Sequence, residues 1–272
     1  MKKILKTFFS LIFLIFSSQT IFAQTSQNID IPCEVKECKP EWGSTYTKWY
    51  KGDGKKNKPA IIWYSGGGGR FLSAENSPIS NLIGKFDIIM VASPFELISD
   101  RSTNGIPLYV NDENLIFRMR HATEHYKKLI NKPIWLGGIS SGGVRVIATI
   151  SGKDRFSDNY AGLIFSSTYV SRMWGSPQSP QYLNLESDIK YEMNLPILVF
   201  QHARDMKPQQ QPYLQEWFTK GLAKKNLNKT ELILMTEGDP MTTTHDGGHH
   251  WFLFNKDEVA RVVEKFIMEN TK

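Results

Sequence analysis

Residues 133–150 read PIWLGGISSGGVRVIATI. The first four are apolar and predict a short strand, and residues 144–150 predict a short apolar helix. Between them lies Gly138-Ile139-Ser140-Ser141-Gly142, which matches the pattern G-x-S-x-G. A strand that turns abruptly into a helix exposes the hydroxyl of such a serine, and flanking glycines remove side chains that would clash in the strained turn. The stretch therefore predicts an α/β fold in which Ser140 is the nucleophile.

Ser141 is the competing nucleophile. Counted from Ser141, the flanking positions are Ile139 and Gly143, so the first glycine of the pattern is missing. We therefore favour Ser140 and expect Ser141 to contribute its backbone N–H to an oxyanion hole. A strand–helix turn without any chemistry is the alternative for the whole stretch.

Further apolar runs lie on both sides of this stretch and alternate with amphipathic segments. Runs without strict alternation suit strands that are buried on both faces; they cover residues 60–64, 86–92, 160–165, 195–200 and 231–235. Helical spacing of apolar residues appears in 111–129 and in the last stretch, from residue 257 onward. This order predicts a mostly parallel central sheet with helices on both faces. Residues 171–194 have no clear period and suit an irregular loop or a small lid.

Four glycines follow the first of these runs, at positions 66–69, directly after Ser65. Backbone N–H groups aimed at the oxygen of a reacting carbonyl can each stabilise its negative charge by about 3 kcal/mol. We expect Gly67 to supply one such donor and Ser141 the other. A flexible turn is the alternative, and a phosphate-binding loop is disfavoured because Arg70-Phe71 follows where Lys and Ser or Thr should stand.

A serine nucleophile needs a base, and the base needs a carboxylate that orients it. Asp205 follows the run at 195–200 by a few residues, which places it near the carboxyl end of a predicted strand, where such sites gather. It is the candidate acid. An Asp that caps a turn or pairs with Arg204 is the structural alternative, and Asp239 is the alternative acid.

Three histidines precede the last predicted helix, at positions 245, 249 and 250. Any of them could be the base by position. They could instead form a metal cluster, but no carboxylate lies at a zincin-like spacing. His202 and His121 are expected to be structural or exposed.

From about Pro59 to its C-terminus, the chain resembles the α/β-hydrolase superfamily. The resemblance rests on YSGGGG after one run, GGISSGG at the turn, QHARD after a later run and GGHHW before the last helix. The order Ser, Asp, His is also the order of that family. The resemblance implies an α/β-hydrolase fold, Ser140 as nucleophile, Asp205 as acid, and Gly67 and Ser141 as oxyanion donors.

The same resemblance bears on the base. In several bacterial members the pattern H-x-F stands shortly before the final helix, and His250-Trp251-Phe252 fits it. Counting from a Gly-His pair would select His249 instead, and we favour His250. The chain departs from the family at Ser65, where a His is common, and this leaves the identity of the oxyanion donor open.

The first 23 residues predict a secretory leader. Lys2, Lys3 and Lys6 precede an apolar run, and Ala23 suits a cleavage site before Gln24. We expect residues 24–272 to form a single α/β-hydrolase domain in the periplasm or outside the cell. Export would also favour a disulfide between the only two cysteines, Cys33 and Cys38.

Composition limits the classes of function. Removal of the leader would leave 30 basic and 27 acidic residues, a net charge of +3, which is too mild to argue for nucleic acid. We expect a serine hydrolase of carboxylic esters or amides that needs no cofactor or metal and acts on a small-molecule substrate. The alternatives are a catalytically silent binding protein of the cell envelope and an acyltransferase, in which an acceptor other than water takes the acyl group.

Overall fold

A computed structural model describes residues 26–32, 45–66, 74–92, 113–151, 154–168, 189–202, 221–235 and 255–271. Their strands are β1 (Ser26–Ile31), β2 (Thr45–Tyr50), β3 (Ala60–Tyr64), β4 (Asp87–Ala92), β5 (Ile134–Ile139), β6 (Gly162–Ser166), β7 (Ile197–His202) and β8 (Thr230–Met235). Their helices are α3 (Glu113–Ile130), α4 (Ser141–Ile150) and α8 (Lys256–Asn270), with short 3₁₀ turns η2 (Ala74–Asn76), η3 (Ser80–Leu82) and η4 (Phe156–Asn159).

The strands form one sheet in the order β1-β2-β4-β3-β5-β6-β7-β8. Neighbours from β4 to β8 in this order run parallel, whereas β2 is antiparallel to both β1 and β4. The predicted mostly parallel sheet is thus confirmed. Because parallel strands end at one edge of the sheet, the chain leaves β3, β5, β6 and β7 on the same side of the molecule.

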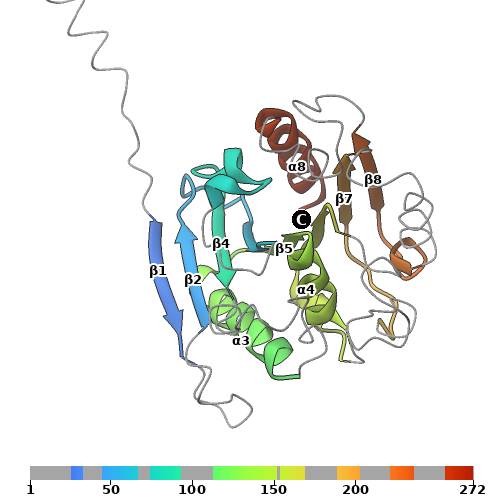
Figure 1. The fold of residues 1–272 in the computed structure, drawn as a ribbon, viewed down its shortest axis with the longest axis horizontal. Coiled ribbons are helices and arrows are strands. Elements are labelled where there is room, and N and C mark those ends of the chain that lie inside the picture. Colours follow the sequence, from blue (N-terminus) through green and yellow to red (C-terminus); the bar gives the residue numbers. More distant parts are fainter. Residues whose placement is uncertain are drawn as a thin grey trace, which may run out of the picture.

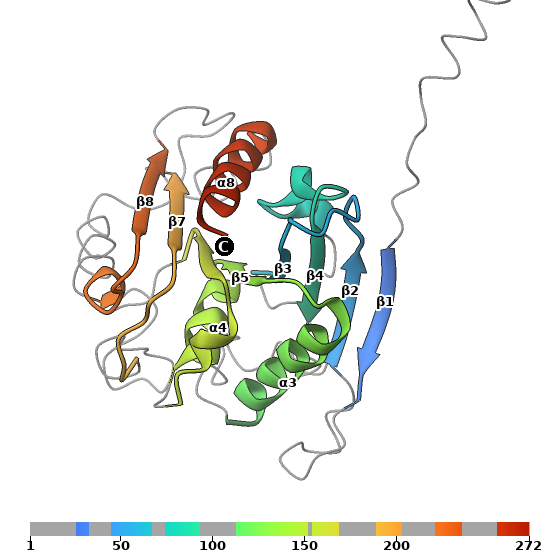
Figure 2. The same ribbon diagram turned by 180° about the vertical axis from the view of Figure 1, so that it is seen from behind.

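Every residue of β3, β5, β6 and β7 is buried, which explains why these strands read as continuous apolar runs. Alternate side chains enter two separate cores. Ile62 and Leu136 pack with residues of α3 and α4, whereas Ile61 and Trp135 pack with α8 on the other face. Figures 1 and 2 show α3 and α4 on one side of β5 and α8 on the other.

The expected strands and helices are found, with shifts of a few residues at their ends. β7 continues to His202, so two residues assigned to the following loop belong to the strand. β1 and β2 were not predicted. β1 is mostly exposed and β2 is half-buried, so neither gives the apolar run that identified the others.

Several predicted features lie outside the described residues. They are the leader, both cysteines and most of the segment 171–194, so the cleavage site, the disulfide and the lid stay predictions. None of the helices in the described ranges is long and apolar enough to cross a membrane.

Candidate active site

Ser140 is the single residue that connects β5, which ends at Ile139, to α4, which begins at Ser141. Its backbone has φ 55° and ψ −125°. A residue with a side chain rarely adopts a positive φ, and holding one there costs roughly 1–3 kcal/mol, so such residues gather at functional sites. The predicted strand–turn–helix context of G-x-S-x-G is present, with Ser140 at the strained corner.

Two hydrogen bonds hold this corner from opposite sides. The Ser140 N–H donates to the carbonyl oxygen of Ser166 at 3.0 Å, and the Gly143 N–H donates to the carbonyl oxygen of Ser140 at 3.0 Å. Ser140 is therefore attached to the sheet through its N–H and to the first turn of α4 through its carbonyl.

The glycines on either side of Ser140 are required by close backbone contacts. A Cβ atom on Gly138 would lie 2.6 Å from the carbonyl carbon of Gly142, and one on Gly142 would lie 2.1 Å from the carbonyl oxygen of Tyr64. Both distances are far below van der Waals contact. The two glycines of the motif thus let α4 begin directly against the ends of β3 and β5.

The start of the glycine-rich loop lies against Ser140. β3 pairs with β5, with Tyr64 opposite Gly138, and the chain then continues into Ser65 and Gly66. A Cβ atom built on Gly66 would lie 3.0 Å from the Cβ of Ser140. The structure therefore brings the beginning of the loop predicted to hold oxyanion donors to the predicted nucleophile, although Gly67 itself lies outside the described residues.

Polar side chains replace apolar ones where β6 and β7 end. Ser166, Ser167, Thr168, Gln201 and His202 are all fully buried. The Thr168 hydroxyl donates to the carbonyl oxygen of Ser166 at 3.0 Å, and Ser167 has a positive φ of 46°. Ligand sites of parallel sheets lie at the carboxyl ends of the strands, so these polar residues lie at the edge, shared with Ser140, where such a site is expected. His202, expected to be structural or exposed, is buried in β7.

The remaining predicted site residues lie outside the described ranges. Asp205 comes three residues after the end of β7, and His250 comes six residues before α8 begins. The same holds for the alternatives Asp239, His245 and His249. The backbone of Ser141 is described and opens α4, where its N–H belongs to the first helical turn. The assignments of acid, base and oxyanion donors thus stay predictions.

Sequence reasoning did not single out Arg145. It lies in α4, is 3% exposed, and donates from Nη1 to the carbonyl oxygen of Ser65 at 3.0 Å. Burial lowers its pKa to about 10, an effect that the nearby Tyr64 hydroxyl partly opposes. The available signal was an arginine in the middle of the apolar helix GGVRVIATI.

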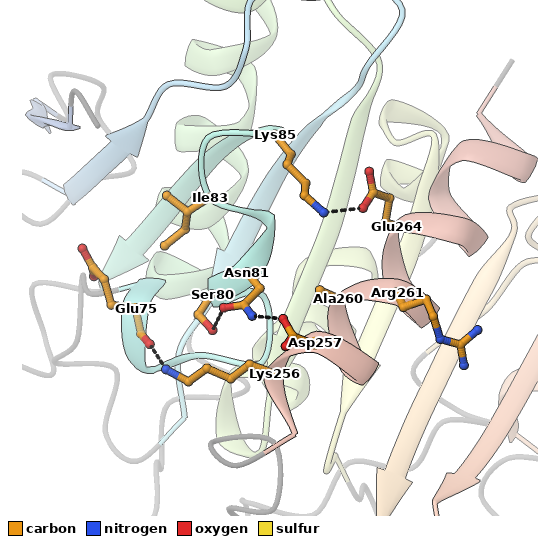
Figure 3. Close-up of a pocket in the computed structure, with 10 residues that line it drawn as sticks. All are labelled: Glu75, Ser80, Asn81, Ile83, Lys85, Lys256, Asp257, Ala260, Arg261 and Glu264. Atoms are coloured by element: carbon orange, nitrogen blue, oxygen red, sulfur yellow. Dashed lines mark hydrogen bonds and ion pairs between the residues drawn. The ribbon is translucent and has the colours of Figure 1, made fainter. Parts of the chain in front are cut away.

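A polar pocket of about 630 Å³ lies elsewhere, between η2, η3 and the first half of α8 (Figure 3). Three contacts join its walls: Asn81 Nδ2 to Asp257 Oδ1 at 2.7 Å, Lys85 Nζ to Glu264 Oε2 at 2.8 Å, and Lys256 Nζ to the carbonyl oxygen of Glu75 at 3.0 Å. One of these contacts, Lys85 with Glu264, is an ion pair, whereas Asp257 binds an amide and Lys256 binds a backbone carbonyl. None of the predicted site residues lines it, so we do not assign the chemistry there.

Comparison with solved structures gives matches along nearly the whole chain. A dienelactone hydrolase from Anabaena variabilis has a TM-score of 0.59 at 12% identity, covering 92% of this chain and 99% of that one. A thermostable carboxylesterase from a metagenomic library has a TM-score of 0.60 at 14% identity, covering 91% and 90%. Oligopeptidase B from Leishmania major has a TM-score of 0.58 at 13% identity, and this chain spans 37% of that longer protein.

No family model and no curated protein matches the sequence. At the identities above, likeness to solved structures shows the arrangement of strands and helices and nothing about activity.

Proposed function

Because this chain has the α/β-hydrolase fold, we propose that it is a serine hydrolase that cleaves carboxylic esters or amides. The observation that carries the proposal is the backbone of Ser140, which is held at φ 55° between β5 and α4. A strained serine at the carboxyl edge of a parallel sheet suits a nucleophile, because the turn exposes its hydroxyl and the helix N-terminus favours nearby negative charge. The solved structures named above include a dienelactone hydrolase, a carboxylesterase and a peptidase, so the proposed reaction is of a kind for which proteins of this fold are named.

In the proposed reaction the Ser140 hydroxyl oxygen attacks the acyl carbon while His250 takes the hydroxyl proton. Asp205 orients the imidazole and stabilises its cationic form. The N–H groups of Gly67 and Ser141 bind the oxygen that becomes negative in the tetrahedral intermediate. The C–O or C–N bond then breaks and His250 protonates the leaving group. Water next attacks the acyl carbon while His250 takes its proton, and the bond to Ser140 breaks as His250 returns a proton to the serine oxygen.

Reaction with a fluorophosphonate probe tests the proposal, together with a panel of acyl esters of graded chain length and peptide amides. Labelling of the wild-type protein and turnover of at least one substrate would support it. If the folded protein neither labels nor hydrolyses any compound of the panel, the catalytically silent binding protein replaces it. Transfer of the acyl group to an added alcohol in preference to water would favour the acyltransferase.

We also propose that the protein is exported after removal of residues 1–23. The support is the basic and apolar composition of these residues. The intact mass of protein recovered from a periplasmic fraction tests this: a chain that begins at Gln24 is expected, and a retained leader would contradict it.

A further inference from the structure

A buried cation lies on the helix that follows the predicted nucleophile. Arg145 comes five residues after Ser140, in the second turn of α4, and its side chain is buried. Burying a guanidinium costs several kcal/mol unless its hydrogen bonds and charge are satisfied. The groups that bind this guanidinium therefore show which parts of the chain it holds in place. One of them is the backbone carbonyl of Ser65, 80 positions away in the sequence.

The contact fixes one peptide group. In a trans peptide the C=O and the following N–H point in opposite directions, and no peptide bond in the described residues is cis. Since the Ser65 carbonyl points at Arg145, the N–H of Gly66 must point away from Arg145. Gly66 is also the residue whose Cα lies against Ser140, as the 3.0 Å approach of its Cβ position shows.

The same carbonyl is confined from a second side. A Cβ atom on Gly142 would lie 2.7 Å from the Ser65 oxygen. α4 therefore contacts the Ser65–Gly66 peptide through its first turn and binds it through its second. Rotation of this peptide would break the hydrogen bond to Arg145 and remove an acceptor from a buried cation, which is costly.

We propose that Arg145 is a positioning residue for the oxyanion hole: by binding the Ser65 carbonyl it fixes the Ser65–Gly66 peptide beside Ser140, at the start of the loop in which we propose Gly67 as an oxyanion donor. This inference rests on the proposed function. Arg145 touches neither the substrate nor the reacting atoms in this role. It acts through the backbone, and its effect falls on the step in which charge develops on the acyl oxygen.

The test compares three variants. Arg145→Met removes the charge and the donors while filling most of the space, and Arg145→Lys keeps the charge with fewer donors. Thr149→Val is the matched control: its hydroxyl, one turn further along α4, donates to the carbonyl oxygen of Arg145 at 2.8 Å and is buried. This control removes a buried hydrogen bond of the same helix without touching Ser65.

For Arg145→Met we expect kcat to fall by about 10–100-fold while KM changes by less than about threefold, since a mispositioned oxyanion donor acts on the transition state. Arg145→Lys should lie between Arg145→Met and wild type. Thr149→Val should lower the melting temperature but keep kcat.

Wild-type kcat and wild-type labelling rate in folded Arg145→Met would overturn the inference and leave the proposed function intact. An equal loss of kcat in Thr149→Val would also overturn it, because the effect would then come from a loosened α4. If Arg145→Met does not fold, Arg145→Lys decides: a lower kcat per folded molecule at unchanged KM supports the inference, and a wild-type kcat per folded molecule contradicts it. Failure of the wild-type protein to label would instead defeat the proposed function.

Discussion

The backbone N–H of Ser140 donates a 3.0 Å hydrogen bond to the carbonyl oxygen of Ser166. The last pair of the β5–β6 ladder is Ile139 with Ser166, so this bond continues the ladder by one residue. Ser140 is thus the point where the sheet still holds the backbone although its φ has become positive. Between β5 and α4 the positive φ falls on this one residue, which the sheet restrains on one side and α4 on the other.

Gly142→Ala should disrupt this corner. Its new Cβ would lie 2.1 Å from the carbonyl oxygen of Tyr64, a backbone atom that cannot rotate away. We expect a loss of about 2–4 kcal/mol in the free energy of unfolding and a large loss of activity in the fraction that folds. Chemical denaturation and turnover of one ester measure the two effects.

Gly54→Ala is the control for that variant. Gly54 has φ +77° but open space around its Cβ position. It should lose about 1–2 kcal/mol from backbone conformation alone and keep full activity per folded molecule. If Gly142→Ala is no less stable than Gly54→Ala, the close contact of α4 with Tyr64 is not as described.

Asp87→Ala should affect stability without affecting activity. Asp87 begins β4, at the edge of the sheet opposite Ser140; its carboxylate accepts hydrogen bonds from Lys132 Nζ at 2.6 Å and Trp49 Nε1 at 3.1 Å. Removing it leaves a largely buried ammonium without its counter-charge, and we expect a loss of about 3 kcal/mol. The pair of Asp53 with Lys58 is the control, because the Asp53 side chain is 27% exposed against 9% for Asp87, and Asp53→Ala should cost at most about 1 kcal/mol. Equal melting temperatures for the two variants would contradict this expectation.

The sequence identified six strands from continuous hydrophobicity, among them β3, β5, β6 and β7, which are buried throughout. The apolar run of β8 also identified a strand, but this strand lies at the edge of the sheet and is only partly buried. The sequence missed β2, whose residues 45–50 read TYTKWY and mix polar and aromatic side chains, since one half-buried antiparallel strand gives a weak pattern. It located the corner at Ser140, because glycines two residues away on both sides of a serine are typical of a strained turn from strand to helix.

Contacts between distant residues could not be read from the sequence. The hydrogen bond from Arg145 to Ser65 depends on how β3 and α4 pack, and the motif specifies neither side of it. The two glycines of the motif were expected from local strain, but the structure assigns Gly142 a contact with Tyr64, on another strand. Acid and base were assigned from their positions after a predicted strand and before the last predicted helix, together with the family resemblance, and the described residues do not test them.

His125 should make stability depend on pH. Burial lowers its pKa below the ordinary value of 6.5, with nearby His121 and Lys128 acting in the same direction. As the pH falls, His125 therefore takes up a proton in the unfolded chain before it does so in the folded chain. The stability that neutral His125 contributes is present above pH 6.5 and is lost as the pH falls through the lower folded-state pKa. An NMR titration should place the His125 midpoint below 6.5, and His125→Gln should lose less stability than wild type between about pH 7.5 and 5. A midpoint above 6.5 would reverse the sign and refute the expectation.

His250 should be the base. Its register to the final helix motivates the choice over His249. His250→Ala should lose activity by several orders of magnitude, whereas His249→Ala should keep much of it, because only the base transfers the serine proton. Turnover of one ester by both folded variants checks this. A dead His249→Ala beside an active His250→Ala would reverse the assignment.

Ser140 itself carries the central claim. Ser140→Ala should abolish acyl-enzyme formation, with a loss on the order of a million-fold in kcat as in comparable triads. Ser141→Ala should keep much of its activity, because alanine retains the backbone N–H that opens α4.

The most direct measurement is fluorophosphonate labelling of the wild-type protein, Ser140→Ala and Ser141→Ala, followed by peptide mapping of the labelled residue. We expect the label on Ser140 in the wild-type protein and in Ser141→Ala, and none in Ser140→Ala. Label on Ser141, or full labelling of Ser140→Ala, would contradict the account.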